Sequence, residues 1–500
     1  MNDHEQSDGP VVPTKPTNKA DARAAAAELV EERGPAKRNP RGGDTPRTQR
    51  RIQGVPSALA RIREAARRDG KQRFTSLMHH IYDVARLRKA YQALRRDAAR
   101  GVDGVTWEAY GQDLERNLED LSRRLARGGY RAQPARRVLI PKADGGKRPI
   151  GVPTLEDKIV QRAAAEVLSA IYEADFLGFS YGFRPGRSQH HALDALTVGI
   201  MSRKVGWVLD ADIRGFFDTL DHEWLMKFVE HRIGDQRVLR LLRKWLKAGV
   251  LEDGVRITSA AGAVQGGSIS PLLANVYLHY VFDLWVQRWR AKRTDGDLIV
   301  VRYADDVVVG FQHQRDGERF QRDLADRLGK FGLELHPDKT RLIEFGRFAA
   351  TNRTRRGLGK PETFNFLGFT HICGKTRRGK FTVRRKTSKR SFQGKLRQTR
   401  ERLRRNLNAT IPDMGRYLAA VVRGHAQYFG VPFNHRAIAS FRWAIVRMWK
   451  WVLERRSERA HIPWERMQRL SDRWIPAVRI CHPHPGERFR VTTRGRSRMR

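Results

Sequence analysis

Two adjacent carboxylates interrupt an apolar stretch in the middle of the chain. The run RYADDVVVGF, at residues 302–311, places Asp305 and Asp306 among Val and Tyr residues that are typical of a strand. Charge on a half-buried pleated surface costs free energy unless something compensates it. A second strand-like run, WVLDADIRGFFDTLDH, carries Asp210 and Asp212, and alternation along a strand places these two on one face.

A third carboxylate beside an Asp-Asp hairpin is what a pair of Mg²⁺ ions needs. Ions held about 3.5–4 Å apart can activate an attacking hydroxyl and stabilise the leaving oxygen of a phosphoryl transfer. Bound cations also offset the repulsion among crowded like charges. The pattern therefore favours two-metal chemistry on phosphates. Asp218 and Asp221, further along the second run, are expected to cap the helix that follows it.

The charge of the chain indicates a polyanionic partner. Its 500 residues include 98 Lys and Arg against 54 Asp and Glu, which gives a formal net charge of +44. Binding to phosphates releases condensed counterions, so such a surplus favours nucleic acid. Cys373 and Cys481 lie too far apart in sequence to indicate a disulfide framework or a cysteine-rich zinc site. With no apolar run of about 18 residues and no signal-peptide pattern, the expected location is cytoplasmic, without a membrane span.

Short β-rich runs and helical stretches alternate over residues 135–345, which predicts an α+β domain. A helical stripe is expected over residues 77–94, and RRVLIPKADGGKRPIGVP is expected to form a hairpin with its tip at residues 143–147. The last 130 residues hold 34 Lys or Arg against 7 Asp or Glu, and two apolar stripes there predict core helices. The Arg-rich faces opposite the stripes favour RNA or DNA contacts.

A series of sequence blocks, in a fixed order, then carries a resemblance. LMHHIYDVARLRKAYQAL, GVDGVTWEAY, IPKADGGKRPIGVPTLEDKIVQ and FLGFSYGFRPGRSQHHAL precede DIRGFFDTLDH, VQGGSISPLLANVYLH and YADD, and HPDKTRLIEFG and FNFLGFTH follow. In this order they resemble the bacterial group II intron-encoded reverse transcriptase/maturase family. The match is weaker in the tail, where GHAQYFG is only loosely similar.

The resemblance implies site residues. Asp212, Asp305 and Asp306 match the family's metal-binding, catalytic aspartates. Asp212 and Asp305 are the implied direct ligands of two Mg²⁺ ions, assisted by the carbonyl of Ile213, and Asp306 is implied to act more through its charge and the positioning of the primer end. A direct metal-binding role for Asp210 is the less favoured alternative.

Contacts to the incoming dNTP are implied as well. Lys142 and Arg148 match the contacts to its triphosphate, with Lys147 as a competitor for that role. Phe217 matches the aromatic that excludes a ribose 2′-hydroxyl, with Phe216 as its alternative. The remaining implied contacts of this site are Gln265 and Lys339.

The implied fold is α+β, a right-hand polymerase with fingers and palm, followed by an all-α thumb or maturase domain. The expected segments are a disordered leader (1–50), an N-terminal extension with fingers (51–200), a palm (201–370), a helical domain (371–480) and a basic tail (481–500), with the reverse transcriptase domain at about 74–372. No CxxC pair is present, so an HNH endonuclease is not expected.

The implied function is RNA-directed DNA synthesis from a primer 3′-hydroxyl, together with binding of intron RNA to assist splicing and mobility. The implied partners are intron RNA, an RNA template with a DNA primer, and dNTPs. Two alternatives stay open: an RNA-binding splicing maturase without polymerase activity, and a related reverse transcriptase of bacterial defence or diversification. The sequence leaves the oligomeric state open.

Overall fold

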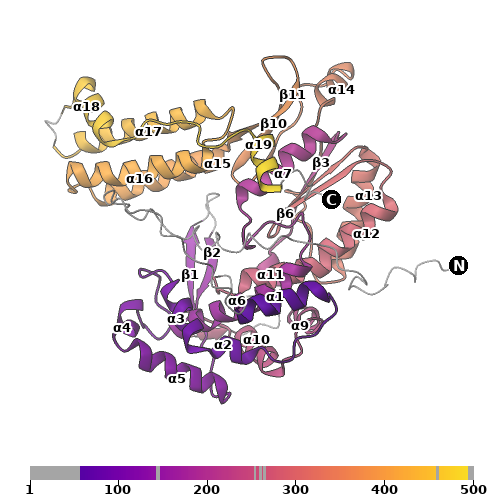
Figure 1. Ribbon diagram of the computed structural model, residues 1–500. Coiled ribbons are helices and arrows are strands. Elements are labelled where there is room, and N and C mark those ends of the chain that lie inside the picture. Colours follow the sequence, from indigo (N-terminus) through magenta and orange to yellow (C-terminus); the bar gives the residue numbers. More distant parts are fainter. Residues whose placement is uncertain are drawn as a thin grey trace, which may run out of the picture.

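A computed structural model describes residues 57–141, 147–252, 255–257, 262, 266–457 and 461–493. A group of N-terminal helices, a central antiparallel sheet and a group of C-terminal helices make up its three parts (Figure 1). The expected leader at residues 1–50 lies outside the described residues. Within the described part, every helix is too short or too polar to span a membrane.

The N-terminal helices pack around the long helix α6 (Leu155–Asp175). They are α1 (Ala58–Arg68), α2 (Met78–Tyr82), α3 (Val84–Gln92), α4 (Trp107–Gln112) and α5 (Leu114–Ala126). The predicted stripe over residues 77–94 divides into α2 and α3 instead of one helix. The division falls at Asp83, whose carboxylate accepts hydrogen bonds from the backbone N–H groups of Ala85 and Arg86 and so caps α3.

A small sheet stands beside these helices. Strands β1 (Ala135–Pro141) and β2 (Lys147–Val152) form the predicted hairpin, and its tip at residues 142–146 lies outside the described residues. Strand β4 (Val250–Glu252) joins β1 in parallel and pairs with β5 (Val255–Ile257). The order of this sheet is β2-β1-β4-β5.

The central sheet has the order β6-β7-β3-β8 and is antiparallel throughout. Its strands are β3 (Trp207–Asp212), β6 (Leu298–Tyr303), β7 (Asp306–Phe311) and β8 (Arg341–Glu344). Strands β3, β6 and β7 confirm the two predicted strand runs. Because side chains alternate along a strand, Val208 and Val308 face α7 (Gln189–Ser202), whereas Leu209 and Val309 face the opposite core. Helix α7 therefore packs on the central sheet.

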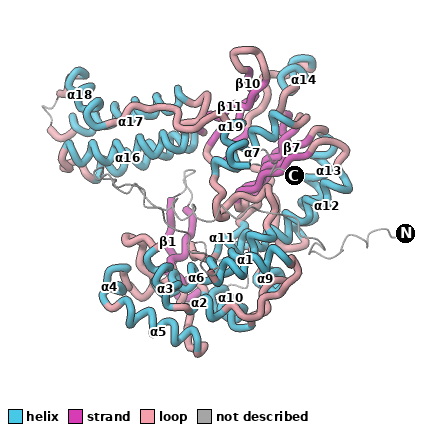
Figure 2. Tube along the Cα trace, in the orientation of Figure 1, coloured by secondary structure: helices cyan, strands magenta, loops and turns pink. Residues whose placement is uncertain are grey.

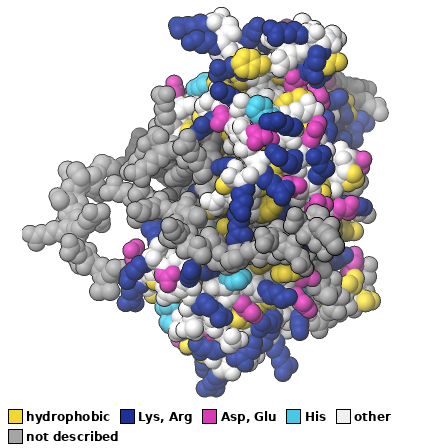
Figure 3. Space-filling view, turned by 90° about the vertical axis from the view of Figure 1, so that its right-hand side faces the viewer, with side chains coloured by type: hydrophobic (Ala, Val, Ile, Leu, Met, Phe, Trp, Pro, Cys, Tyr) yellow, Lys and Arg dark blue, Asp and Glu magenta, His cyan; other side chains and the backbone are white. Residues whose placement is uncertain are grey.

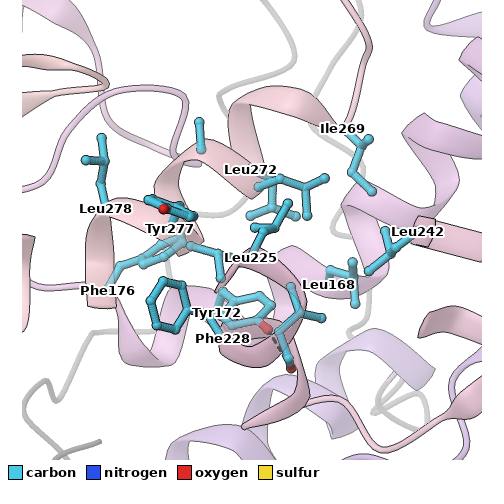
Figure 4. Close-up of a cluster of buried hydrophobic side chains, with 14 of the residues drawn as sticks. Leu168, Tyr172, Phe176, Leu225, Phe228, Leu242, Ile269, Leu272, Tyr277 and Leu278 are labelled. Carbon is cyan, nitrogen blue, oxygen red and sulfur yellow. Dashed lines mark hydrogen bonds between the residues drawn. The ribbon is translucent and has the colours of Figure 1, made fainter. Parts of the chain in front are cut away.

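Helices cover both sides of the central strands (Figure 2). Those of the opposite core are α8 (Phe216–Thr219), α9 (His222–Glu230), α10 (Gln236–Ala248), α11 (Ser270–Leu278), α12 (Leu284–Arg293) and α13 (Gln314–Gly329). Between α6, α9, α10 and α11 lies a dense apolar core, in which Tyr172 donates a hydrogen bond to the backbone carbonyl of Val229 at 3.2 Å (Figure 4). A π-helical turn, η2 (His279–Asp283), separates α11 from α12.

The C-terminal helices begin later than the residue 371 expected from the sequence. Strands β9 (Phe364–Phe366), β10 (Phe369–Lys375) and β11 (Phe381–Thr387) first form a three-stranded sheet, preceded by α14 (Ala349–Arg355). The helices are α15 (Lys389–Arg405), α16 (Ile411–Phe429), α17 (His435–Glu454) and α18 (Trp464–Trp474). Leu418 and Val422 of α16 meet Phe441 and Ile445 of α17 in a shared core, which confirms the two predicted apolar stripes.

The last described helix folds back onto α7, within the segment expected to be a basic tail. Helix α19 (Pro485–Thr493) packs on α7. Asp194 of α7, 1% exposed, accepts hydrogen bonds from Arg385 of β11 at 3.0 Å and from Arg488 of α19 at 2.8 Å. Burial, with help from His482 and Arg488, lowers the pKa of His190 to about 2, so its imidazole is neutral beside these cations. The HPHPGERF segment therefore links the end of the chain to α7, beside strand β11.

Replacing Asp194 with Ala should destabilise the protein strongly. Two guanidinium groups would remain buried without their shared carboxylate, which costs about 3–5 kcal/mol of unfolding free energy. Chemical denaturation followed by circular dichroism measures the loss. The matched control is Asp120→Ala, which removes the solvent-exposed partner of Arg123 and Arg124 and should cost less than about 1 kcal/mol. Equal losses of unfolding free energy in the two variants would contradict a stabilising role for the buried Asp194 carboxylate.

Candidate active site

The YADD segment forms a two-residue turn between β6 and β7. Tyr303 and Asp306 are paired across the hairpin, so Ala304 and Asp305 make the turn. Ala304 has φ 55°, in the left-handed region that side chains other than Gly adopt only at some cost. Asp305 is half-buried and Asp306 is exposed. A strained residue thus stands directly before the paired carboxylates.

Asp212 lies opposite Asp306 on the neighbouring strand. The two residues are register partners of β3 and β7, so their side chains leave the same face of the sheet. The Asp212 carboxylate accepts a hydrogen bond from the Lys339 ammonium at 3.1 Å. The Asp212 backbone carbonyl accepts one from the His336 N–H at 2.8 Å. The segment after α13 therefore wraps the end of β3 and brings a cation to it.

The carboxylate oxygens of this region are the type of ligand that Mg²⁺ prefers. The Asp212 carboxylate already pairs with one cation, the Lys339 ammonium. Ile213, whose carbonyl is the further expected ligand, is buried and bridges to Leu335. Over the described residues, however, no three Asp, Glu, His or Cys side chains are arranged closely enough to hold a metal ion. The structure thus brings Asp212, Asp305 and Asp306 to one end of the sheet without assembling them into a chelating group.

Asp210 shares the face of Asp212, as alternation predicted. Burial raises the pKa of the Asp210 carboxyl to about 7; Arg341 acts against the rise and Asp212 adds to it. Near neutral pH this carboxyl therefore carries a proton for much of the time, and a protonated carboxyl is a weaker ligand than a carboxylate.

A buried ion pair stabilises the YADD turn. Arg302 and Asp283 are both fully buried, and the guanidinium donates to both carboxylate oxygens, at 2.7 and 2.6 Å. The same guanidinium donates to the side-chain oxygen of Asn275 at 3.0 Å and to the Ala304 carbonyl at 2.9 Å. Burial opposes ionisation of Asp283, yet Arg302 lowers the pKa of this carboxyl below its ordinary value. The network fixes the turn because the planar guanidinium allows few orientations.

The partners of Arg302 come from a helix with a local defect. Asn275 lies in α11, and Asp283 ends the π-helical turn η2 that follows it. Such turns occur frequently at functional sites, where they reorient side chains. Sequence reasoning missed this network. The available signal was Arg302 itself, a charged residue in the same apolar run that drew attention to the two aspartates.

The position of Phe217 differs from that of its alternative, Phe216. Both lie in the short helix α8 and not in a strand, so strand alternation does not apply to them. Phe216 is 2% exposed and packs in the core against Tyr277. Phe217 is half-buried, which leaves it the more accessible of the two.

Of the two aspartates expected to cap the next helix, Asp221 does so and Asp218 does not. Asp221 caps α9 by accepting a hydrogen bond from the Trp224 N–H at 2.8 Å, as predicted. Asp218 lies exposed within α8, and that helix has Gly215 at its N-cap, so the capping role expected of Asp218 is not found there.

Three of the expected dNTP contacts cannot be placed. Lys142 and Gln265 lie outside the described residues. Arg148 and its competitor Lys147 belong to β2, in register with Ile140 and Pro141, and their side chains are not described. The Lys339 ammonium, in contrast, is placed by its hydrogen bond to the Asp212 carboxylate.

Comparisons with known proteins agree with this arrangement. Residues 140–371, which contain β3, β6, β7 and the turn with Asp305, match the family described as reverse transcriptase (RNA-dependent DNA polymerase). Protein YkfC of Escherichia coli K12 is 37% identical over 274 residues, which cover 48% of this chain and 71% of that protein. The group II intron-encoded protein LtrA of Lactococcus lactis subsp. cremoris is 32% identical over 312 residues, covering 61% of this chain and 51% of that protein.

These matches define the class, a nucleotide-polymerising enzyme with its carboxylates on an antiparallel sheet. The chain belongs to the reverse transcriptase family, and its matched domain is that of an RNA-dependent DNA polymerase. It spans about half the length of LtrA and 71% of YkfC.

The role of the buried pair can be separated from its effect on stability. Arg302→Met alone should cost about 3–5 kcal/mol of unfolding free energy, because it leaves the Asp283 charge buried and unpaired. The double variant Arg302→Met/Asp283→Leu should recover most of that stability. It should still slow nucleotide addition about 10- to 100-fold, because the Ala304 carbonyl loses a charged donor.

A second ion pair serves as the matched control. Arg232→Met/Asp175→Leu removes a buried pair, 3.0 Å apart, that touches none of the YADD residues. It should leave the rate of nucleotide addition within about threefold of wild type. A fully active Arg302→Met/Asp283→Leu enzyme would contradict the positioning role.

Proposed function

We propose that this protein is an RNA-directed DNA polymerase that extends a primer 3′-hydroxyl with dNTPs. The observation that carries the proposal is the direct pairing of Asp212 with Asp306, beside the Asp305 turn, inside the family-matched domain. A strongly basic chain supplies the attraction for template and primer that this chemistry needs.

In the proposed mechanism, Asp212 and Asp305 hold two Mg²⁺ ions, with the Ile213 carbonyl as a further ligand. When bound, the ions activate the attacking hydroxyl and stabilise the leaving oxygen of an in-line displacement. Asp306 adds negative charge beside them and helps to position the primer end. Lys339 pairs with Asp212 in the structure. Its ammonium would organise the site carboxylates or contact the triphosphate.

The remaining dNTP contacts complete the site as proposed. Lys142 and Arg148 meet the triphosphate, and Gln265 lies near the nucleotide and template. Phe217 excludes a ribose 2′-hydroxyl and so favours dNTPs.

We further propose that the protein binds a group II intron RNA in the cytoplasm and assists its splicing and mobility. LtrA, to which the chain is similar, is by its name a group II intron-encoded protein. The C-terminal helices carry a large excess of Arg, and Lys and Arg side chains are scattered over the face seen in Figure 3, among acidic and apolar ones. Binding only the folded RNA would stabilise it by mass action. The second candidate is an RNA-binding maturase without polymerase activity.

Primer extension on an RNA template decides between these candidates. With Mg²⁺ and dNTPs, the wild type should synthesise DNA, and Asp305→Ala/Asp306→Ala should reduce the rate by at least about 1000-fold, because the metal-binding carboxylates are lost. Asp326→Ala, which removes an exposed carboxylate of α13, is the control and should be fully active. A folded, RNA-binding wild type that makes no DNA would favour the maturase.

Sugar discrimination tests the assignment of Phe217. Phe217→Val should raise the rate of rNTP incorporation relative to dNTP incorporation by about 10-fold or more, because a smaller side chain leaves room for the 2′-hydroxyl. Single-nucleotide kinetics with dGTP and GTP measure the ratio. Phe216→Leu should leave the ratio unchanged, because Phe216 belongs to the core. The opposite pattern would transfer the role to Phe216.

A further inference from the structure

Phe183 has an unfavourable backbone conformation and an exposed aromatic side chain. Its backbone has φ 54°, in the left-handed region that bulky side chains avoid, and its side chain is 56% exposed. A glycine would adopt this conformation without steric cost. Strained residues of this kind persist where the surroundings force them, and they cluster at functional sites. The folded chain alone gives no reason for an aromatic ring here.

The segment before Phe183 packs closely against strand β6 and the YADD turn. Residues 179–181 add to the edge of the central sheet, since Tyr181 donates its N–H to the Arg302 carbonyl at 2.8 Å and Arg302 donates its N–H to the Phe179 carbonyl at 2.9 Å. A Cβ atom on Gly182 would lie 2.3 Å from the Ala304 nitrogen, so only glycine fits this approach. Asn275, which also contacts Arg302, donates to the Gly182 carbonyl at 2.7 Å.

The residue after Phe183 is anchored as firmly. Arg184 is 3% exposed and donates to both carboxylate oxygens of Glu173, at 3.1 and 3.0 Å. It also donates to the backbone carbonyls of Leu177 and Ser180, at 2.7 and 2.9 Å. Phe183 therefore stands between two fixed neighbours, which impose its backbone conformation and leave its ring on the surface.

The ring of Phe183 is beside the YADD turn. Its centroid lies 6.1 Å from that of Tyr303, the residue that begins the turn, with 47° between the ring planes. Successive nucleotides of a strand rise by about 3.4 Å, so the two rings together span about two nucleotide steps. Aromatic side chains stack on bases and sugars of any sequence.

We propose that Phe183 is a positioning residue that contacts the last nucleotides of the primer strand. This inference rests on the proposed polymerase function, because the reacting 3′-hydroxyl must lie at the carboxylates of the turn. The strand that carries this hydroxyl is the primer, and it passes over Tyr303 and Phe183. The contacts of Gly182 with Asn275 and Ala304 tie this segment to the same Arg302 network that holds the turn, so the primer end and the carboxylates share one frame.

The test compares two phenylalanines in the same backbone state. Phe183→Gly removes the ring and leaves a residue that accepts positive φ, so folding is not the limiting factor. Phe433→Gly is the matched control, because Phe433 has φ 69° and is 51% exposed, and it lies beneath Arg384 of β11. Phe183→Trp is the conservative replacement that should restore the contact.

The probe is an RNA template annealed to a DNA primer with 2-aminopurine as its 3′-terminal base. Phe183→Gly should raise 2-aminopurine emission in the protein–duplex complex and slow the first dNTP addition at saturating dNTP about tenfold. Its affinity for the duplex should change by less than about threefold, because phosphate contacts dominate binding. Phe183→Trp should restore both readouts.

Identical behaviour of Phe183→Gly and Phe433→Gly in both readouts would overturn the proposal. The emission measurement requires no chemistry, so it separates this inference from the proposed function. If 2-aminopurine emission is lower with the wild type than with Phe183→Gly, but the wild type adds no nucleotide, the contact is supported and the polymerase assignment is overturned.

Discussion

The ion pair between Arg302 and Asp283 is the interaction on which the active-site geometry depends. Removing two charges from water is costly, and the cost is offset here because the guanidinium and carboxylate meet in a bidentate geometry. The donors left over bind Asn275 and the Ala304 carbonyl. One buried group thus joins strand β6, the α11–η2 helix and the YADD turn. Such a network specifies one arrangement of the turn, because any other would leave a buried charge unpaired.

The site also places negative charge inside a strongly positive protein. Asp210 and Asp212 lie on β3, Asp306 lies on the neighbouring β7, and Asp305 lies in the turn before it, in a chain with a net charge of +44. The overall charge attracts nucleic acid over a long range, whereas the local carboxylates repel phosphate at the point of reaction. Cations resolve this opposition. The Lys339 ammonium lies at Asp212, and the raised pKa of Asp210 adds a proton nearby.

A second buried charge cluster joins α7 to the C-terminal region. Asp194 accepts hydrogen bonds from Arg385 and Arg488, which belong to β11 and α19. Helix α7 is thereby held from two directions, and the three-stranded sheet before the C-terminal helices is fixed to the central sheet. The α16 and α17 helices therefore project from a firm base (Figure 1).

The sequence by itself determined the elements whose signal is local. Val-rich runs predicted β3, β6 and β7, apolar periodicity predicted α16 and α17, and ordered blocks indicated the family that the comparisons then showed. The Asp-Asp pair and its partner Asp212 could be found because unusual residues stood in otherwise apolar runs. Helix boundaries were less accessible, since a single cap at Asp83 divides one stripe into two helices.

Only the tertiary structure decided the contacts between distant segments. The approach of Gly182 to Ala304, the choice of Asp283 as partner of Arg302, and the docking of α19 on Asp194 join residues far apart in sequence. Nothing in the local pattern distinguishes a buried, paired Arg from a solvated one in a chain with 98 Lys and Arg residues. Burial and hydrogen-bond geometry make that distinction, and both arise only when the chain is folded.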